Sequence, residues 1–238
     1  MPKQPSSPVA EICYGPMKSG KSRYLVQQSE AFHRNGLSFL SFKPVQDTRD
    51  GSFIRSRDTA CRDVQALGIS NSRELAEFIR QAISQPGAFA AGLPQPVAGA
   101  LALQSAFRPD ASLHACLIDE VFLLDGELLD VLTELRAGNV SVYLSGLDRD
   151  FRGEYFPLRH FERHGLTMQA VIEICDRSFS LQASCEVCAA PAELTQRLIN
   201  GSPAPYDSPT VLIGDEEYEP RCREHHCLLG KPSLSAAS

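Results

Sequence analysis

A chain of 238 residues that is 43% hydrophobic and 22% charged has the composition of a folded globular protein, which excludes disordered and fibrous classes. Its net charge of −6 argues against direct nucleic-acid binding, because an electrostatic grip on phosphate backbones normally needs a basic surplus. No stretch reaches the roughly 20 apolar residues that span a bilayer, and residues 1–10 lack a signal-like apolar run. We therefore expect a cytoplasmic protein without a membrane segment.

Short apolar runs predict the strands of a sheet. The pattern predicts strands that are buried on both faces, as in a parallel sheet. The four runs are Val9–Tyr14, Ser38–Phe42, Leu113–Ile118 and Val140–Leu144. Helical patterns separate these runs, and strands that alternate with helices imply right-handed crossovers. The predicted fold class is α/β, with a doubly wound parallel sheet.

The helical patterns have recognisable ends. Apolar spacing predicts helices over Ser22–Asn35, Glu74–Ile83 and Glu127–Ala137, with glycines directly after the first and the last. Asn71 and Glu74 stand at capping-box spacing. We expect the second helix to bury one face made of Leu75, Phe78, Ile79 and Ile83.

Composition divides the chain into unequal parts. We expect flexible ends at residues 1–9 and 229–238 and a main domain over residues 10–174. Within that domain, residues 85–112 mix proline, glycine and alanine without a clear period, which predicts a surface insertion. From Cys175 the composition shifts to cysteine, proline and short polar turns, which predicts a smaller lobe over residues 175–228.

A phosphate-binding loop follows the first predicted strand. The pattern G-x-x-x-x-G-K-[ST] is complete in Gly15, Pro16, Met17, Lys18, Ser19, Gly20, Lys21 and Ser22. Backbone N–H groups of such a loop form an anion nest at a helix N-terminus. Lys21 would neutralise the β- and γ-phosphates, and Ser22 would ligate Mg²⁺. The motif predicts nucleotide binding and leaves the reaction open.

An acidic pair ends the predicted strand Leu113–Ile118. Asp119 and Glu120 lie at the carboxyl edge of the sheet, where doubly wound folds hold their ligands. Asp119 can anchor magnesium beside the phosphate loop, and Glu120 can then act on a nucleophile. That nucleophile is water in an ATPase and a hydroxyl in a kinase, and the dipeptide does not distinguish them.

Two knuckles of metal-binding residues lie near the C-terminus. Cys185 and Cys188 form one, Cys222 and His225 form the other, and 33 residues separate the two. Three cysteines and a histidine are ligands that tetrahedral Zn²⁺ prefers, and a closed set of four favours a structural ion in a zinc-ribbon-like lobe. Competing ligands are Cys175, His226 and Cys227, whereas the scattered Cys13, Cys61 and Cys116 are expected to be packing residues.

These motifs together resemble those of the type II thymidine kinases. The resemblance covers roughly residues 11–84 and 113–226, and its most specific stretches are residues 15–22, 118–120, 146–154, 195–206 and 217–223. It implies a P-loop domain with a zinc-bearing lobe that carries a substrate-binding lasso. It also implies a homotetramer.

The resemblance further implies an activity and its residues. Glu120 takes the general-base position and would accept the proton of the thymidine 5′-hydroxyl as that oxygen attacks the γ-phosphate of ATP; deoxyuridine is a possible second substrate. The thymine pocket of the family maps onto Met17, Leu147, Phe151, Phe156, Thr195 and Tyr218. ATP and thymidine are the implied partners, with Mg²⁺ and a structural Zn²⁺ as cofactors.

Two other functions remain open at this point. Phe122 follows the acidic pair where the family carries a polar residue, and Ile213–Glu216 is about one residue shorter than the usual lasso. Both features are compatible with a catalytically weak nucleotide-binding regulator. A zinc-ribbon ATPase acting on nucleic acid fits the loop and the metal ligands but conflicts with the acidic charge.

Overall fold

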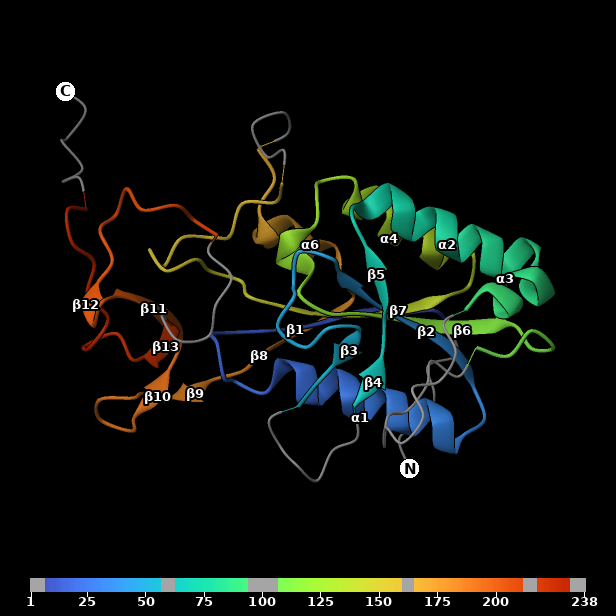
Figure 1. The fold of residues 1–238 in the computed structure, drawn as a ribbon, viewed down its shortest axis with the longest axis horizontal. Coiled ribbons are helices and arrows are strands. Elements are labelled where there is room, and N and C mark those ends of the chain that lie inside the picture. Colours follow the sequence, from blue (N-terminus) through green and yellow to red (C-terminus); the bar gives the residue numbers. More distant parts are fainter. Residues whose placement is uncertain (1–6, 57–62, 94–106, 160–164, 212–217, 232–238) are drawn as a thin grey trace.

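The computed structural model describes residues 7–56, 63–93, 107–159, 165–211 and 218–231. Within these ranges a parallel sheet carries helices on both faces, and the antiparallel strands of the C-terminal part gather at one end of the molecule (Figure 1). None of the helices in these ranges has the length and apolar composition to cross a bilayer. The α/β class and the parallel sheet are confirmed.

The central sheet has six strands in the order β5-β2-β6-β7-β1-β8, and every pairing is parallel. The strands are β1 Ala10–Tyr14, β2 Ser38–Pro44, β5 Leu67–Ile69, β6 Leu113–Ile118, β7 Ser141–Gly146 and β8 Arg177–Ser180. All four predicted strands are therefore present. The two that the sequence did not predict are the edge strands, and β8 lacks an apolar run because all its residues are exposed.

Helices cover the two faces of the sheet with separate apolar cores. Helix α1 (Lys21–Arg34) packs on one face through Leu25, Val26 and Phe32. Helices α2 (Ser72–Ser84), α4 (Leu128–Ala137) and α6 (Met168–Ile174) pack on the other. The three predicted helices are confirmed to within two residues at every end.

Helix α2 contains one confirmed detail and one correction. The Asn71 side chain accepts a hydrogen bond from the Glu74 N–H at 2.9 Å, so the predicted cap is present. Ile79 is buried as expected, but Ile83 is 53% exposed. Ala82 fills the last buried position instead, because Ile83 lies at the rim of the core one residue before the helix ends.

The segment 85–112 begins with regular structure. Helix α3 (Pro86–Gly92) follows α2, and its Phe89 is buried in the main core. The Phe89 ring lies 5.2 Å from that of Phe107, so the two sides of the segment pack together. Residues 94–106 of the predicted insertion lie outside the described ranges.

The sheet continues beyond Cys175, where the sequence predicted the smaller lobe to begin. Strand β8 pairs with β1, and only after it does the chain leave the sheet. The C-terminal lobe, residues 183–231, contains two small antiparallel sheets. These are built from β9 Ala183–Ser184 with β10 Pro191–Ala192, and β11 Leu194–Ile199 with β12 Ser202–Pro203 and β13 Tyr218–Arg221.

Two short elements border the carboxyl edge of the central sheet. The hairpin of β3 (Phe53–Ile54) and β4 (Val64–Gln65) follows β2. The 3-10 turn η1 (Val121–Leu123) follows β6 and buries all three of its side chains. These elements bring the residues after β2 and β6 toward the loop after β1.

Candidate active site

The loop after β1 has the geometry of a phosphate-binding loop. Gly15 has a φ of +144°, and a Cβ there would lie 2.2 Å from the Leu181 carbonyl oxygen, so only glycine fits. Lys21 begins α1 and donates from Nζ to the Pro16 carbonyl at 2.7 Å. The loop therefore closes on its own lysine at the N-terminus of α1, and a helix N-terminus of this kind can bind an anion.

Lys21 is a buried cation among carboxylates. It is 8% exposed. Burial lowers the pKa of Lys21, whereas the charges of Glu120, Asp119 and Asp148 raise it. A phosphate bound in the loop would add negative charge beside the ammonium group, which favours the protonated lysine.

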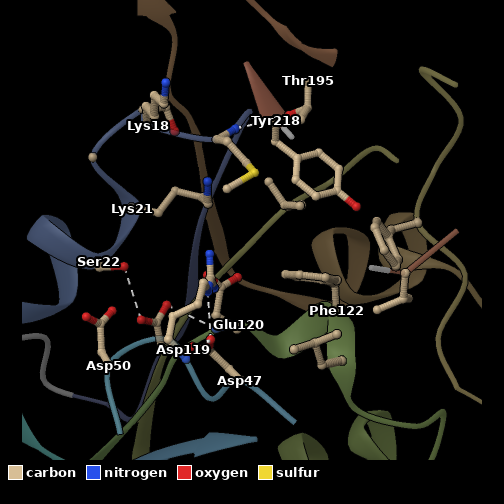
Figure 2. A pocket seen from close by; sticks show the side chains of 18 of the residues that line it. Lys18, Lys21, Ser22, Asp47, Asp50, Asp119, Glu120, Phe122, Thr195 and Tyr218 are labelled. Carbon is tan, nitrogen blue, oxygen red and sulfur yellow. Dashed lines mark hydrogen bonds and ion pairs between the residues drawn. The ribbon is translucent and has the colours of Figure 1, made fainter. Parts of the chain in front are cut away.

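Asp119 is held in place from several sides. Its Oδ2 accepts a hydrogen bond from Ser22 Oγ at 3.1 Å, while Oδ1 accepts from Ser145 Oγ and from the Glu120 N–H. Burial raises the pKa of Asp119 to about 6, and the neighbouring Glu120 charge adds to the rise. A carboxylate and a hydroxyl side by side at the phosphate loop form a pair that could hold Mg²⁺ (Figure 2).

Glu120 has one carboxylate oxygen that no described residue pairs with. The residue has a φ of +50°, a left-handed conformation that is uncommon outside glycine and turns the chain sharply after β6. Its Oε1 pairs with Arg49 Nη2 at 2.5 Å. Its Oε2 is buried and has no hydrogen-bond partner among the described residues. Glu120 lines the cavity described below, so this unsatisfied acceptor lies next to the space where a substrate hydroxyl could bind.

Arg49 also belongs to this site, although no motif in the sequence indicates it. Besides Glu120 it contacts Asp47, whose Oδ1 accepts from Arg49 Nε at 2.7 Å, and Asp47 also pairs with the buried Lys43 at 3.1 Å. Burial acts to raise the pKa of Asp47, but these two cations outweigh it and lower the pKa. The position of Arg49 in the sequence is the one indication of this role. Asp47 and Arg49 closely follow β2, at the same carboxyl edge of the sheet as the phosphate loop.

One cavity of about 420 Å³ joins the phosphate site to an apolar slot. Its lining includes every residue predicted for the base pocket, namely Met17, Leu147, Phe151, Phe156, Thr195 and Tyr218. Phe122 also lines it, and its ring lies 4.5 Å from that of Phe156. Figure 2 shows Lys21 and Ser22 on one side of the hollow and Phe122 on the other. The cavity therefore joins a charged half to an aromatic half.

The C-terminal lobe forms part of the phosphate side. Thr195 Oγ1 accepts a hydrogen bond from the Met17 N–H at 3.1 Å. Lys18 Nζ pairs with Glu186 at 2.9 Å. In the sequence Glu186 lies between Cys185 and Cys188, two of the predicted metal ligands. The ammonium group of Lys18 is thus engaged with the lobe, whereas that of Lys21 bonds the phosphate loop itself.

The four predicted metal ligands lie together in the lobe. One ligand atom from each of Cys185, Cys188, Cys222 and His225 falls within 4.8 Å of all the others. The Sγ atoms of Cys188 and Cys222 are 3.7 Å apart, which matches the roughly 3.8 Å edge of a tetrahedron with Zn–S bonds of about 2.3 Å. Burial opposes ionisation of Cys185, but backbone N–H groups outweigh it and lower its pKa to about 6. The set fits Zn²⁺.

The competing ligands have other surroundings. His226 Nε2 donates to the Phe151 carbonyl at 2.9 Å, so its ring faces the main domain. Cys227 is exposed, and burial raises the pKa of Cys175 to about 12. Cys13 and Cys116 are buried packing residues as predicted, whereas Cys61 lies outside the described ranges. So does the expected lasso segment 213–216.

Comparisons with known proteins agree with this geometry. The family model described as "Thymidine kinase" matches residues 9–85 and 100–226. The chain is 31% identical to a thymidine kinase of Mycoplasmoides gallisepticum, over 94% of this chain and 83% of that protein. It is 32% identical to a thymidine kinase of Pyrobaculum aerophilum, over 91% of this chain and 97% of that protein. The chain therefore belongs to the thymidine kinase family.

Proposed function

We propose that this protein transfers the γ-phosphate of ATP to the 5′-hydroxyl of thymidine and so forms thymidine monophosphate for nucleotide salvage. The observation that carries the proposal is a cavity lined on one side by Lys21, the Ser22–Asp119 pair and Glu120 and on the other by an aromatic slot. Family membership supports it. Neither alternative is favoured, because the phosphate residues are all in place and no described feature points to nucleic acid.

In the proposed reaction the phosphate loop holds the triphosphate. Backbone N–H groups of residues 18–20 and the ammonium group of Lys21 would compensate the phosphate charges. Ser22 and Asp119 would hold Mg²⁺, which when bound neutralises charge on the β- and γ-oxygens. Because these groups are fixed before ATP arrives, little reorganisation is needed during the transfer.

Glu120 would act as the general base. Its Oε2 accepts the proton of the 5′-hydroxyl while that oxygen forms a bond to the γ-phosphorus and the bond from that phosphorus to the β–γ bridging oxygen breaks. Arg49 pairs with the other carboxylate oxygen, which leaves Oε2 as the acceptor for this proton. The same guanidinium group lines the cavity and would meet the charge that develops on the transferred phosphoryl group.

The aromatic half of the cavity would hold the base. Phe151 and Phe156 are almost fully buried, and with Met17 they form flat apolar walls. Thr195 and Tyr218 supply polar groups that can fix the orientation of the base. We further propose a structural Zn²⁺ in the C-terminal lobe, a homotetramer and a cytoplasmic location.

Base selectivity tests the slot. We expect kcat/KM for thymidine to exceed that for deoxyguanosine by at least about 100-fold, because a second ring does not fit between the aromatic walls. Deoxycytidine should also be disfavoured, since a site built for one hydrogen-bond pattern leaves polar groups unpaired with another. A coupled kinase assay across the nucleosides measures this. Equal use of all three would contradict the pocket, and equal use of the two pyrimidines would contradict polar readout of the base.

Metal content tests the C-terminal lobe. We expect one Zn²⁺ per chain by elemental analysis of protein purified without chelator, and loss of the metal in Cys185→Ser. The lobe should then open to proteolysis, because a structural ion supplies folding free energy to a lobe with few buried apolar residues. Cys227→Ser is the matched control and should keep the metal, since Cys227 lies outside the ligand set. Freshly prepared protein without zinc would defeat the assignment.

A further inference from the structure

Phe151, a wall of the cavity, lies beside two arginines that the proposed reaction does not use. The Phe151 ring is 2% exposed. The guanidinium carbon of Arg152 is 4.7 Å from the ring centroid, and that of Arg197 is 5.5 Å away. Both distances are within the roughly 6 Å range of a cation–π contact. Both arginines come from stretches that carry the family resemblance, yet neither contacts the phosphate loop in any described bond.

The same two arginines also hold a chain segment that borders the cavity. Arg152 donates from all three of its guanidinium nitrogens, to the carbonyl oxygens of Tyr206 and Ser208 and the hydroxyl of Thr210, at 2.7, 2.7 and 2.9 Å. Arg197 Nη1 donates to the Pro209 carbonyl at 2.6 Å. Residues 206–210 contain no helix or strand, so the arginines replace the backbone donors that regular structure would supply.

A buried carboxylate fixes Arg152, whereas Arg197 keeps one donor that no described residue satisfies. Asp150 is 3% exposed, and its Oδ2 accepts from Arg152 Nη1 at 2.8 Å. Arg197 is 1% exposed on β11, where its Nε is buried without a hydrogen-bond partner among the described residues. An unsatisfied buried donor costs free energy, so fold stability alone is a poor reason for an arginine at this position. The contacts of Arg197 with Phe151 and Pro209 are a better explanation for an arginine at this position.

We propose that Arg152 and Arg197 are positioning residues for the nucleoside. They hold residues 206–210 against Phe151, and thereby fix Thr210 and Val211, which line the cavity. The role requires arginine, because the planar guanidinium group bonds several acceptors in a fixed plane, whereas a lysine ammonium group is a single point charge. This inference rests on the proposed function and adds residues that select and orient the substrate without touching it.

Arg152→Lys is the test variant, because it keeps the charge and removes the fork of donors. Its side chain is 15% exposed, so the substitution leaves the deep core intact. We expect the KM for thymidine to rise about tenfold or more, since bonds from a charged donor to the segment are lost. The KM for ATP should stay within about twofold and kcat within about threefold, because the phosphate machinery is untouched. The control is Arg80→Lys, the same change at an exposed arginine that pairs with Glu134, because neither of these residues lines the cavity.

Hydrogen exchange measured without substrate gives an independent readout. Amides of residues 206–211 should exchange faster in Arg152→Lys than in the unmodified protein, while amides of residues 15–22 keep their protection. Unchanged exchange at 206–211, or an equal rise of both KM values, would overturn the positioning role. If the unmodified protein does not phosphorylate thymidine, the proposed function fails, and exchange at 206–211 alone then decides whether the arginines hold the segment.

Discussion

Glu120→Gln should lower kcat for thymidine phosphorylation by about 100-fold or more, the usual scale for loss of a general base. The amide keeps the size of the side chain and can still accept from Arg49, but it cannot take a proton from the 5′-hydroxyl. ATP should bind as tightly as before, because its contacts come from the phosphate loop. Steady-state kinetics together with calorimetric titration of ATP separate the two effects.

The matched control is Glu134→Gln, the same change at an exposed carboxylate that pairs with Arg80 on the helical face. It should leave turnover unchanged, since this exposed ion pair contributes little to stability and neither residue lines the cavity. Near-normal turnover in Glu120→Gln would show that the free oxygen at this position does not accept the proton. Loss of ATP affinity instead would mean that Glu120 helps to build the phosphate site.

Local motifs made the phosphate half of the site predictable. Lys21 and Ser22 belong to one short contiguous motif. The residue spacing on which its chemistry depends can be recognised directly in the sequence. Asp119 was predictable because the end of a buried strand marks the ligand edge of a parallel sheet. Arg49 was not, since its role depends on the turn after β2 bringing it to Glu120, a contact between residues 71 positions apart.

The aromatic half and the sheet edges show the limits of side-chain patterns. Phe151 and Phe156 are buried like core residues, so periodicity cannot reveal that they also line a cavity; only the family resemblance pointed to the slot. Strand β8 has exposed residues throughout, and it joins β1 through the backbone ladder and an ion pair between Arg177 and Glu11 rather than through buried apolar side chains. The helix α3 was missed for a related reason, because a seven-residue helix with a single buried side chain has no period to detect.

Lys21→Ala should weaken ATP binding by about tenfold or more and reduce phosphoryl transfer further. A charge-assisted bond to phosphate contributes about 1.5–3 kcal/mol, and this cation also stabilises charge that develops during transfer. The loss should be greater at the transition state than in the ground state, so kcat should fall along with affinity. Calorimetry with ATP and single-turnover kinetics measure the two parts.

Lys18→Ala, three residues earlier in the same loop, is the control for that prediction. The Lys18 ammonium group pairs with Glu186 at 2.9 Å, and both side chains are partly exposed, so its removal should cost little ATP affinity. Equal losses in the two variants would mean that overall positive charge, not the buried position of Lys21 against the Pro16 carbonyl, holds the nucleotide. Unchanged ATP affinity in Lys21→Ala would contradict the phosphate-loop assignment itself, because no other lysine of this loop lies beside Asp119 and Glu120 in the described cavity.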